Sequence, residues 1–235
     1  MLLAAGRGER MRPLTDSCPK PLLVVRGKPL LQWHQEALQR GGCQQALVNT
    51  DWLAEQIVHA APVPGLAMHY SHEGHDFGGA LETAGGIARA LPMLDEVFWV
   101  LAADVYTPGF EFSQEAIARF AATDKLAHLW LVPNPAHNPG GDFGLQAAAG
   151  GPALALNLAK DDPRPRHTFS TIGLYRRALF EAPWCDIAAG NPRGIKAPLA
   201  SLLRRAMDQG RVSVELYHGP WTDVGTPQRL AELNA

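Results

Sequence analysis

A cluster of glycines and arginines stands near the start of the chain, where residues 3–15 read LAAGRGERMRPLT. The apolar run at its beginning stops at Gly6 and Gly8, and glycine permits a sharp turn that leaves backbone N–H groups free to face a ligand. The interspersed arginines indicate that this ligand is an anion. The segment matches neither a dinucleotide-binding fingerprint nor a phosphate loop, and a tight structural turn with solvated arginines is the alternative.

A lysine follows in the segment CPKPLL (18–23). Lys20 stands between Pro19 and Pro21, and proline restricts both its own φ and the residue before it, so the ammonium group is held on a stiff segment. We expect Lys20 to pair with a phosphate as a point charge. The alternative is a surface lysine in a proline-rich connector.

Two aspartates follow apolar or turn-forming segments. Asp104 ends the apolar run at 98–103, and Asp223 lies in the turn WTDVGT (221–226). A carboxylate at the end of a core strand is costly to desolvate unless it is paired or binds a cation, and two carboxylates beside a phosphate suit Mg²⁺. Taken singly, Asp104 could be a helix N-cap or a salt-bridge partner, and Asp223 an ordinary turn residue.

The tract HYSHEGHDFGG (69–79) holds three histidines at a spacing of three residues. A helix would gather their side chains, but the segment is predicted to be a strand running into a glycine loop, in which the side chains diverge. We therefore expect this tract to form a loop that closes over a ligand, and not a zinc site.

These residues need a framework that brings the ends of distant segments together. Apolar runs predict strands at 2–5, 46–50, 66–71, 97–104, 126–133, 143–148, 153–159 and 168–175, with a last strand after residue 210. Helical spacing predicts helices at 29–42, 51–60, 82–91, 113–122 and 197–209, with Asp51 and Ser113 as N-caps. This alternation is typical of an α/β fold with helices on both faces of the sheet, where ligands bind beyond the carboxyl ends of the strands.

The composition limits the classes of protein to which the chain can belong. With 235 residues, 46% of them hydrophobic, it can bury one sizeable core, so we expect a single domain. A net charge of −2 provides no basic field for nucleic acid or for an acidic membrane surface. Three distant cysteines argue against a disulfide framework, and we find neither a membrane-spanning run nor a signal peptide. We therefore expect a cytoplasmic protein.

The first predicted strand looks cut short, because only Met1 to Ala4 precede the turn. This indicates that a few residues are missing from the start of the chain or that its start is misplaced.

Over nearly its whole length, the chain resembles the sugar-phosphate nucleotidyltransferases. Residues 3–15 are similar to the family's opening signature LAAGxGxRMxPLT, PKPLL to its lysine motif, and LETAGGI to the start of its nucleotide-side helix, while AADV and WTDVGTPQRL resemble the segments that carry its metal aspartates. The resemblance implies a Rossmann-like (GT-A-like) domain over residues 1–235 with a central, mostly parallel mixed sheet. Its nucleotide-binding half would span about 1–110 and its sugar-phosphate-binding half about 111–235.

The resemblance also implies roles for individual residues. The nucleotide-binding positions would be Ala5, Gly6, Arg7, Gly8 and Gly85. Arg10 would neutralise the departing pyrophosphate, and Lys20 would contact the α-phosphate or the incoming phosphate. Asp104 and Asp223 would hold Mg²⁺, and the residues facing the sugar phosphate would be Ala102, Gly141 and Asp142.

The chain departs from the family pattern at Ala102 and Ala103, where the family usually has Asn-Gly. This change removes an amide that could contact the sugar or the ribose and adds a Cβ close to the nucleotide. The loop at 73–81 also looks longer than in similar sequences.

Among subfamilies, the segments GDFGL and TFSTIGLY and the C-terminal portion are most similar to the uridylyltransferases that act on N-acetylmuramate 1-phosphate in bacterial cell-wall recycling. The substrates implied are a nucleoside triphosphate and a sugar 1-phosphate, and the short chain without a trailing repeat domain favours a monomer. One alternative is a glucose-1-phosphate or mannose-1-phosphate nucleotidyltransferase that uses another base. An alternative of a different class is a non-catalytic, nucleotide-binding regulatory subunit.

Overall fold

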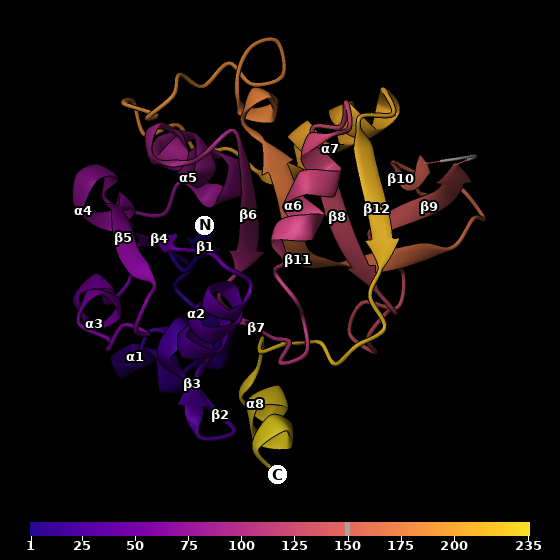
Figure 1. Cartoon of the computed structure of the whole chain (residues 1–235). Coiled ribbons are helices and arrows are strands. Elements are labelled where there is room, and N and C mark those ends of the chain that lie inside the picture. Colours follow the sequence, from indigo (N-terminus) through magenta and orange to yellow (C-terminus); the bar gives the residue numbers. More distant parts are fainter. Residues whose placement is uncertain (149–150) are drawn as a thin grey trace.

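A single continuous sheet forms the centre of the computed structural model, which describes residues 1–148 and 151–235 (Figure 1). Within these residues nine strands pair in the order β5-β4-β1-β6-β11-β8-β12-β10-β9. Their bounds are β1 (Leu2–Leu3), β4 (Gln45–Thr50), β5 (Ala67–His72), β6 (Val97–Ala102), β8 (Ala127–Val132), β9 (Phe143–Ala148), β10 (Gly151–Leu156), β11 (Arg166–Arg176) and β12 (Val212–Leu216).

The sheet is mixed, as expected, and its two halves differ in strand direction. The strands β5, β4, β1 and β6 run parallel to one another, and β6 pairs antiparallel with β11 on its other side. In the second half β8 and β12 are parallel, whereas β11, β10 and β9 pair antiparallel with theirs. The parallel part therefore lies in the N-terminal half, where four carboxyl strand ends meet at one edge.

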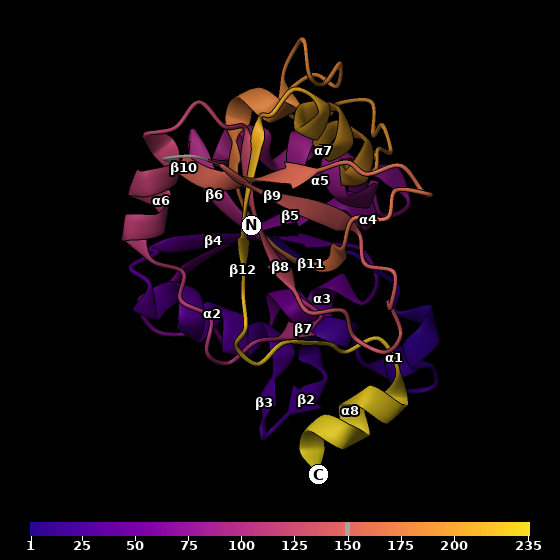
Figure 2. The same ribbon diagram turned by 90° about the vertical axis from the view of Figure 1, so that its right-hand side faces the viewer.

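Helices cover both faces of the sheet, which confirms the expected α/β architecture. Figure 2 shows α5 (Glu82–Ala90) and α7 (Leu199–Asp208) on one side of the strands, and α2 (Leu30–Arg40) and α3 (Ala54–Val58) on the other. One buried cluster joins α5 and α7 to the sheet, and a second joins α2, α3 and α6 (Gln114–Ala121) to its opposite face. Burial on both faces explains why the central strands are continuous apolar runs.

Of the two predicted N-caps, Ser113 and Asp51, only the first caps a helix. Ser113 caps α6, since its hydroxyl accepts a hydrogen bond from the Ala116 amide at 3.1 Å. Asp51 does not cap α3, which begins only at Ala54 after Leu53 in a left-handed conformation. The Asp51 carboxylate accepts a hydrogen bond from the Ala80 amide at 3.0 Å instead, so a tertiary contact replaces the predicted local one.

Short elements complete the fold. Those around the first turn are the 3-10 helix η1 (Glu9–Met11), α1 (Leu14–Ser17), the 3-10 helix η2 (Lys20–Leu22), β2 (Val24–Val25) and β3 (Lys28–Pro29). Elsewhere lie α4 (Glu73–Phe77), η3 (Leu91–Met93), β7 (Val105–Tyr106), η4 (Arg177–Phe180), β13 (Thr222–Asp223) and α8 (Pro227–Asn234). None of the helices in the described residues is long and apolar enough to cross a lipid bilayer.

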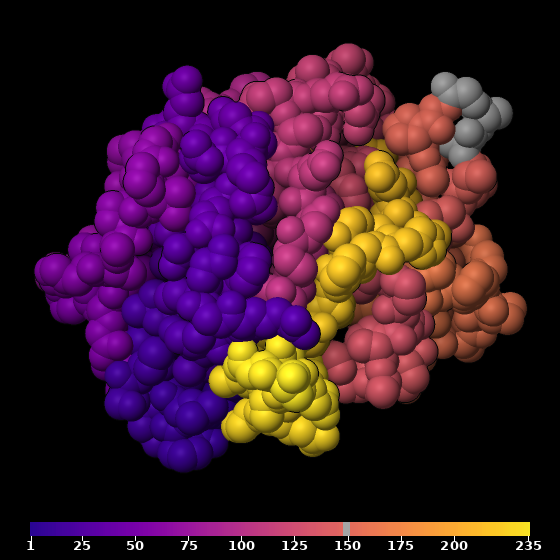
Figure 3. All heavy atoms as spheres, turned by 60° about the horizontal axis from the view of Figure 1, so that its bottom comes forward, coloured from indigo at the N-terminus to yellow at the C-terminus, as the bar shows by residue number. Residues whose placement is uncertain are grey.

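The last helix, α8, was not predicted, and it packs against the beginning of the chain. Figure 3 shows this yellow segment beside the indigo N-terminal residues. Asn234 ties the two together, because its Nδ2 donates to the Val24 carbonyl at 3.0 Å and its Oδ1 accepts from the Arg26 amide at 2.7 Å. The C-terminal helix is therefore fastened to the segment at 24–26, in the N-terminal part of the chain.

Candidate active site

The turn after β1 and the end of β6 share one pocket. Its volume is about 340 Å³, and its lining residues are Gly6, Gly8, Glu9, Arg10, Met11, Lys20, Asp104 and Gly225. The two strands are parallel neighbours, so their carboxyl ends lie at the same edge of the sheet. The structure thus brings Asp104 to the glycine turn, Arg10 and Lys20, from which it is far removed in the sequence.

Gly8 gives this turn its shape. Its φ of +68° lies in the left-handed region, and a Cβ there would lie 3.1 Å from Thr15 Cγ2. The Thr15 hydroxyl donates to the Gly8 carbonyl at 2.8 Å, so α1 holds the turn from outside. At Gly6, by contrast, a Cβ would meet no atom of the described residues within 4 Å, and this part of the turn is open to a ligand.

Lys20 and Asp104 face each other within the pocket. The Lys20 ammonium donates to Asp104 Oδ2, and only 11% of the lysine side chain and 34% of the aspartate side chain are exposed. A charge withdrawn from water is costly unless it is paired, so each group stabilises the other in the pocket. A phosphate that enters the pocket offers the lysine a second anionic partner.

Arg10 and Arg7 lie in different surroundings. Arg10 lines the pocket, is exposed, and forms no salt bridge with any described residue. The Arg7 guanidinium lies 3.5 Å from the centroid of the Trp52 ring and donates through Nη1 to the Thr15 carbonyl at 3.0 Å. Its side chain is therefore held against neighbouring elements and is not part of the pocket lining.

Asp223 reaches the same edge of the sheet from the C-terminal part of the chain. In the β7–β13 pair it lies opposite Val105, and the Val224 amide donates to the Asp104 carbonyl at 2.8 Å. The backbones of the two aspartates are consequently neighbours, as the predicted shared site requires.

Two side chains from different elements hold the Asp223 carboxylate. Arg229 of α8 donates to its Oδ1, and His137 Nε2 lies 2.9 Å from the same oxygen. Sequence analysis missed both residues, although Thr226 followed by Pro227 is the usual signature of a helix start and would have placed Arg229 in the first turn of a helix.

The two aspartates suit a divalent cation that is shared with a substrate. Carboxylate oxygens are ligands for Mg²⁺, which usually takes one or two of them and completes its shell with water and phosphate oxygens. Over residues 1–148 and 151–235, no group of three or more His, Cys, Asp or Glu side chains gathers in a way that could hold a metal.

A buried hydrogen-bond network fixes the end of β1. The Ala4 amide donates to Asn49 Oδ1 at 2.7 Å, and Asn49 Nδ2 donates to Glu73 Oε1 at 2.8 Å. The Leu81 amide donates to the other Glu73 oxygen at 2.8 Å. Burial raises the pKa of the Glu73 carboxyl group, although the hydrogen bonds from Leu81 and Asn49 act in the opposite direction.

This network corrects the prediction for residues 69–79. The strand predicted at 66–71 is confirmed by β5, but Glu73–Phe77 form the helix α4, where a glycine loop was expected. Glu73 lies in the core because Asn49 and the Leu81 amide satisfy its oxygens, and such a tertiary arrangement leaves no local trace in the sequence.

Two positions expected to bind the nucleotide are buried. A Cβ at Gly85 would lie 2.4 Å from the Ile195 carbonyl oxygen, and the Gly85 amide donates to the Ala197 carbonyl at 3.2 Å. Gly85 therefore allows α5 to pack closely against the segment that precedes α7. Ala5 is also buried, and it leads directly into the open turn at Gly6.

Ala102 lines a second cavity, next to the first. This cavity of about 480 Å³ also includes Leu3, Phe143, Phe169 and Thr171 in its lining. The Ala102 amide donates to Thr171 Oγ1 at 3.3 Å, and Thr171 has a φ of +69°, which is rare for a β-branched residue. The end of β6 thus borders both cavities, through Ala102 and Asp104.

Gly141 and Asp142 shape the loop beside β11 and do not line either of these cavities. Gly141 has a φ of +61°, and a Cβ there would lie 2.8 Å from the Arg166 carbonyl carbon. The Asp142 carboxylate accepts a hydrogen bond from the Phe169 amide at 2.8 Å. Both residues therefore anchor the loop.

Comparison with known proteins gives consistent matches over the whole chain. The family model described as "Nucleotidyl transferase" matches residues 1–235. The N-acetylmuramate alpha-1-phosphate uridylyltransferase of Neisseria meningitidis serogroup B is 43% identical, and the match covers 100% of this chain and 96% of that protein. The enzyme with the same name from Caulobacter vibrioides is 39% identical over 99% of this chain and 96% of its own length.

Among solved structures, the UDP-glucose pyrophosphorylase from Acinetobacter baumanii superposes with a TM-score of 0.72. The match covers 99% of this chain and 90% of that one at 15% sequence identity. At this identity the likeness concerns the fold alone.

Proposed function

Because this chain belongs to the nucleotidyl transferase family, we propose that it is a Mg²⁺-dependent uridylyltransferase that converts UTP and N-acetylmuramate 1-phosphate to UDP-N-acetylmuramate and pyrophosphate. The choice of substrates is supported by the names of the two relatives that match over 96% of their length. The structural observation that carries the proposal is the pocket in which Gly6, Gly8, Arg10, Lys20 and Asp104 converge.

In the proposed reaction an oxygen of the sugar 1-phosphate attacks the α-phosphorus of UTP. The bond between the α-phosphorus and the bridging oxygen breaks, and pyrophosphate leaves with its electron pair. The attacking oxygen is already anionic near neutral pH, so the protein does not need to supply a base. Catalysis then rests on positioning the two phosphates and on offsetting their charge.

The roles proposed for the pocket residues follow from their surroundings. The open turn at Gly6 and Gly8 would receive the triphosphate, and Arg10, which has no salt-bridge partner among the described residues, would contact the departing pyrophosphate. Lys20 would move from Asp104 to the α-phosphate or the incoming phosphate. Asp104 and Asp223 would hold Mg²⁺, which would supply further positive charge at the phosphate oxygens.

The two halves of the chain would divide the substrates. We assign the nucleotide to about 1–110, including Ala5 and the backbone of Arg7, and the sugar phosphate to about 111–235. Ala102 would face the sugar from the edge of the second cavity. Gly85, Gly141 and Asp142 would act indirectly, by shaping the surrounding loops.

We also propose a cellular location, an oligomeric state and a pathway for the enzyme. We place the enzyme in the cytoplasm as a monomer of a single domain, acting in peptidoglycan recycling. The three free cysteines of the structure, Cys18, Cys43 and Cys185, are consistent with a reducing compartment.

A pyrophosphate-release assay with Mg²⁺ tests the substrates. UTP, dTTP, GTP and CTP are each combined with the 1-phosphates of N-acetylmuramate, N-acetylglucosamine, glucose and mannose. We expect the fastest release from UTP with N-acetylmuramate 1-phosphate. A different best pair would replace the proposed substrates but keep nucleotidyl transfer, whereas no release from folded, nucleotide-binding protein would favour a regulatory subunit.

A further inference from the structure

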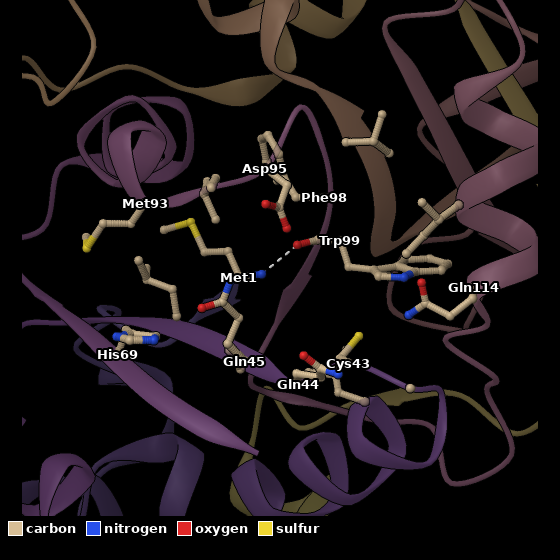
Figure 4. A pocket seen from close by; sticks show the side chains of 17 residues that line it. Met1, Cys43, Gln44, Gln45, His69, Met93, Asp95, Phe98, Trp99 and Gln114 are labelled. Carbon is tan, nitrogen blue, oxygen red and sulfur yellow. Dashed lines mark hydrogen bonds between the residues drawn. The ribbon is translucent and has the colours of Figure 1, made fainter. Parts of the chain in front are cut away.

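A hollow of about 530 Å³ lies at the amino ends of β4 and β6, at the opposite end of β1 from the candidate active site. Figure 4 shows Met1 within it, with Gln45 on one side and Phe98 and Trp99 on the other. The proposed reaction uses none of these residues, so the hollow needs a separate explanation.

The hollow interrupts the middle of the sheet. Leu2 and Leu3 of β1 pair with β4 on one side and with β6 on the other. Within the described residues, β1 therefore contributes only two residues to the ladder on each side. Continuing that register places Met1 opposite Leu47 of β4 and Val100 of β6. At their amino ends β4 therefore extends two residues beyond Met1, to Gln45, and β6 extends three residues beyond it, to Val97. Because neighbouring strands lie about 4.8 Å apart, the space left between β4 and β6 is the width of one strand.

Met1 already continues the ladder into this space. Its nitrogen donates to the Trp99 carbonyl at 2.6 Å, and its carbonyl accepts from the Leu101 amide at 3.2 Å. The group at the end of this ladder is an α-amine, which is buried, and burial lowers its pKa to about 5. A peptide N–H in the same place would make the same bond to Trp99 without a buried ionisable group.

The sides of the hollow determine which residues would fit. Met1 packs in the cluster that contains Leu47 and Phe98, whereas Leu2 packs in the opposite cluster with Trp99 and Leu38. Because side chains alternate along a strand, a residue before Met1 would face Leu38 and Trp99, and the one before it would face Phe98. Both positions are apolar.

We propose that two or three apolar residues preceding Met1 in the same polypeptide fill this slot and lengthen β1 at its amino end, parallel to β4 and β6. An occupant joined to Met1 is favoured over a separate peptide because the Met1 backbone already holds the next position in the ladder. The proposal is independent of the substrates, since it concerns the strand that leads to the turn and not the turn itself.

The first test identifies the N-terminal peptide of the protein as its own organism makes it, by mass spectrometry. We expect a peptide that begins at least two residues before Met1 and has apolar residues at those positions. A native N-terminus at Met1 would overturn the proposal.

The second test compares three chains: the one that begins at Met1, one preceded by Val-Ile-Val, and one preceded by Gly-Ser-Gly. We expect Val-Ile-Val to raise the midpoint of thermal unfolding by at least about 4 °C over Gly-Ser-Gly, because it buries apolar side chains and pairs with β4 and β6. Hydrogen exchange should slow at the Trp99 amide in the Val-Ile-Val chain alone. Equal midpoints and equal exchange in the two extended chains would show that the slot does not take a strand.

Discussion

Arg10 and Arg12 are only two residues apart, but their side chains lie in different surroundings. Arg10 lines the pocket, whereas Arg12 forms a salt bridge with Asp16 at 2.9 Å and is exposed. Replacing a charge donor that acts on the transition state typically costs on the order of 10²-fold in rate. We therefore predict that Arg10→Ala loses turnover by about this factor under saturating substrates, and that Arg12→Ala changes it less than threefold, roughly within the effect of a surface substitution.

The rate of pyrophosphate release from each purified variant measures this difference. Equal turnover in Arg10→Ala and Arg12→Ala, with both variants folded, would remove Arg10 from the mechanism.

Buried histidines lead to a prediction about pH. Burial lowers the pKa of His34 to about 4 and that of His128 to about 4, from an ordinary value of 6.5. Between these values the unfolded chain takes up protons that the folded chain does not, so the free energy of unfolding falls as the pH drops from about 6.5 to about 4. We predict that His128→Asn makes this fall shallower.

Urea unfolding at several pH values gives the slope for each protein, and the exposed His59→Asn variant is the control. The comparison of slopes isolates His128 from the buried Glu73, whose raised pKa acts in the opposite sense. A His128→Asn slope identical to that of the unchanged protein would contradict the prediction.

At the scale of elements, the turn between β1 and η1 should depend on glycine for its shape. We predict that Gly8→Ala lowers the free energy of unfolding by about 1–2 kcal/mol, because its φ of +68° is unfavourable for other residues. We also predict a loss of turnover, since the Cβ would press on Thr15 and displace the turn.

Gly27 provides a matched control for this turn. It lies between β2 and β3 with a φ of +82°, and a Cβ there would meet no described atom within 4 Å. Gly27→Ala should lose a similar amount of stability in urea unfolding and keep its turnover. Loss of turnover in both variants would mean that backbone strain alone, and not the position of the turn, explains the effect.

The link from α4 through Asn49 to β1 should contribute stability. Asn49→Leu would leave the Ala4 amide and the Glu73 carboxyl group without their partner. We predict a loss of at least about 2 kcal/mol in the free energy of unfolding, because buried polar groups without partners are costly. Asn157→Leu, at a site where the side chain bonds Asp208 near the surface, should cost less than about 1 kcal/mol in the same urea titration.

Elements with a strong local pattern were predicted well. Helix α6 has both a periodic apolar face and a capping serine, and the central strands are apolar on both faces. Residues 51–53 and 73–77 were predicted less well, because Asp51 bonds to the Ala80 amide, 29 residues away, and Glu73 bonds to the Asn49 side chain, 24 residues away. Local propensity carries no information about such partners.

At the scale of the whole molecule, the candidate site depends on segments from both ends of the sequence. The motif spacing was sufficient to place Gly6, Gly8, Lys20 and Asp104 together, because each follows a strand or turn whose end lies at the same edge of the sheet. It was not sufficient to show that α8 and the loop at 134–142 hold Asp223 through Arg229 and His137. The loop follows β8, and the segment that carries Asp223 and α8 follows β12, the parallel neighbour of β8 in the sheet. The local sequence pattern does not indicate that pairing.

We propose that the pocket at the ends of β1 and β6 transfers a uridylyl group. The most direct measurement follows UTP labelled at the α-phosphorus in the presence of Mg²⁺ and N-acetylmuramate 1-phosphate. It compares the unchanged protein with Lys20→Ala and with Lys28→Ala, whose lysine pairs with Glu36 at 2.6 Å outside the pocket.

We predict that the label appears in UDP-N-acetylmuramate with the unchanged protein and with Lys28→Ala, and that Lys20→Ala forms this product on the order of 10²-fold more slowly. Label that stays in UTP with the folded, unchanged protein would rule out uridylyl transfer to this sugar phosphate. Label that moves equally fast with Lys20→Ala would rule out the role of Lys20 in this pocket.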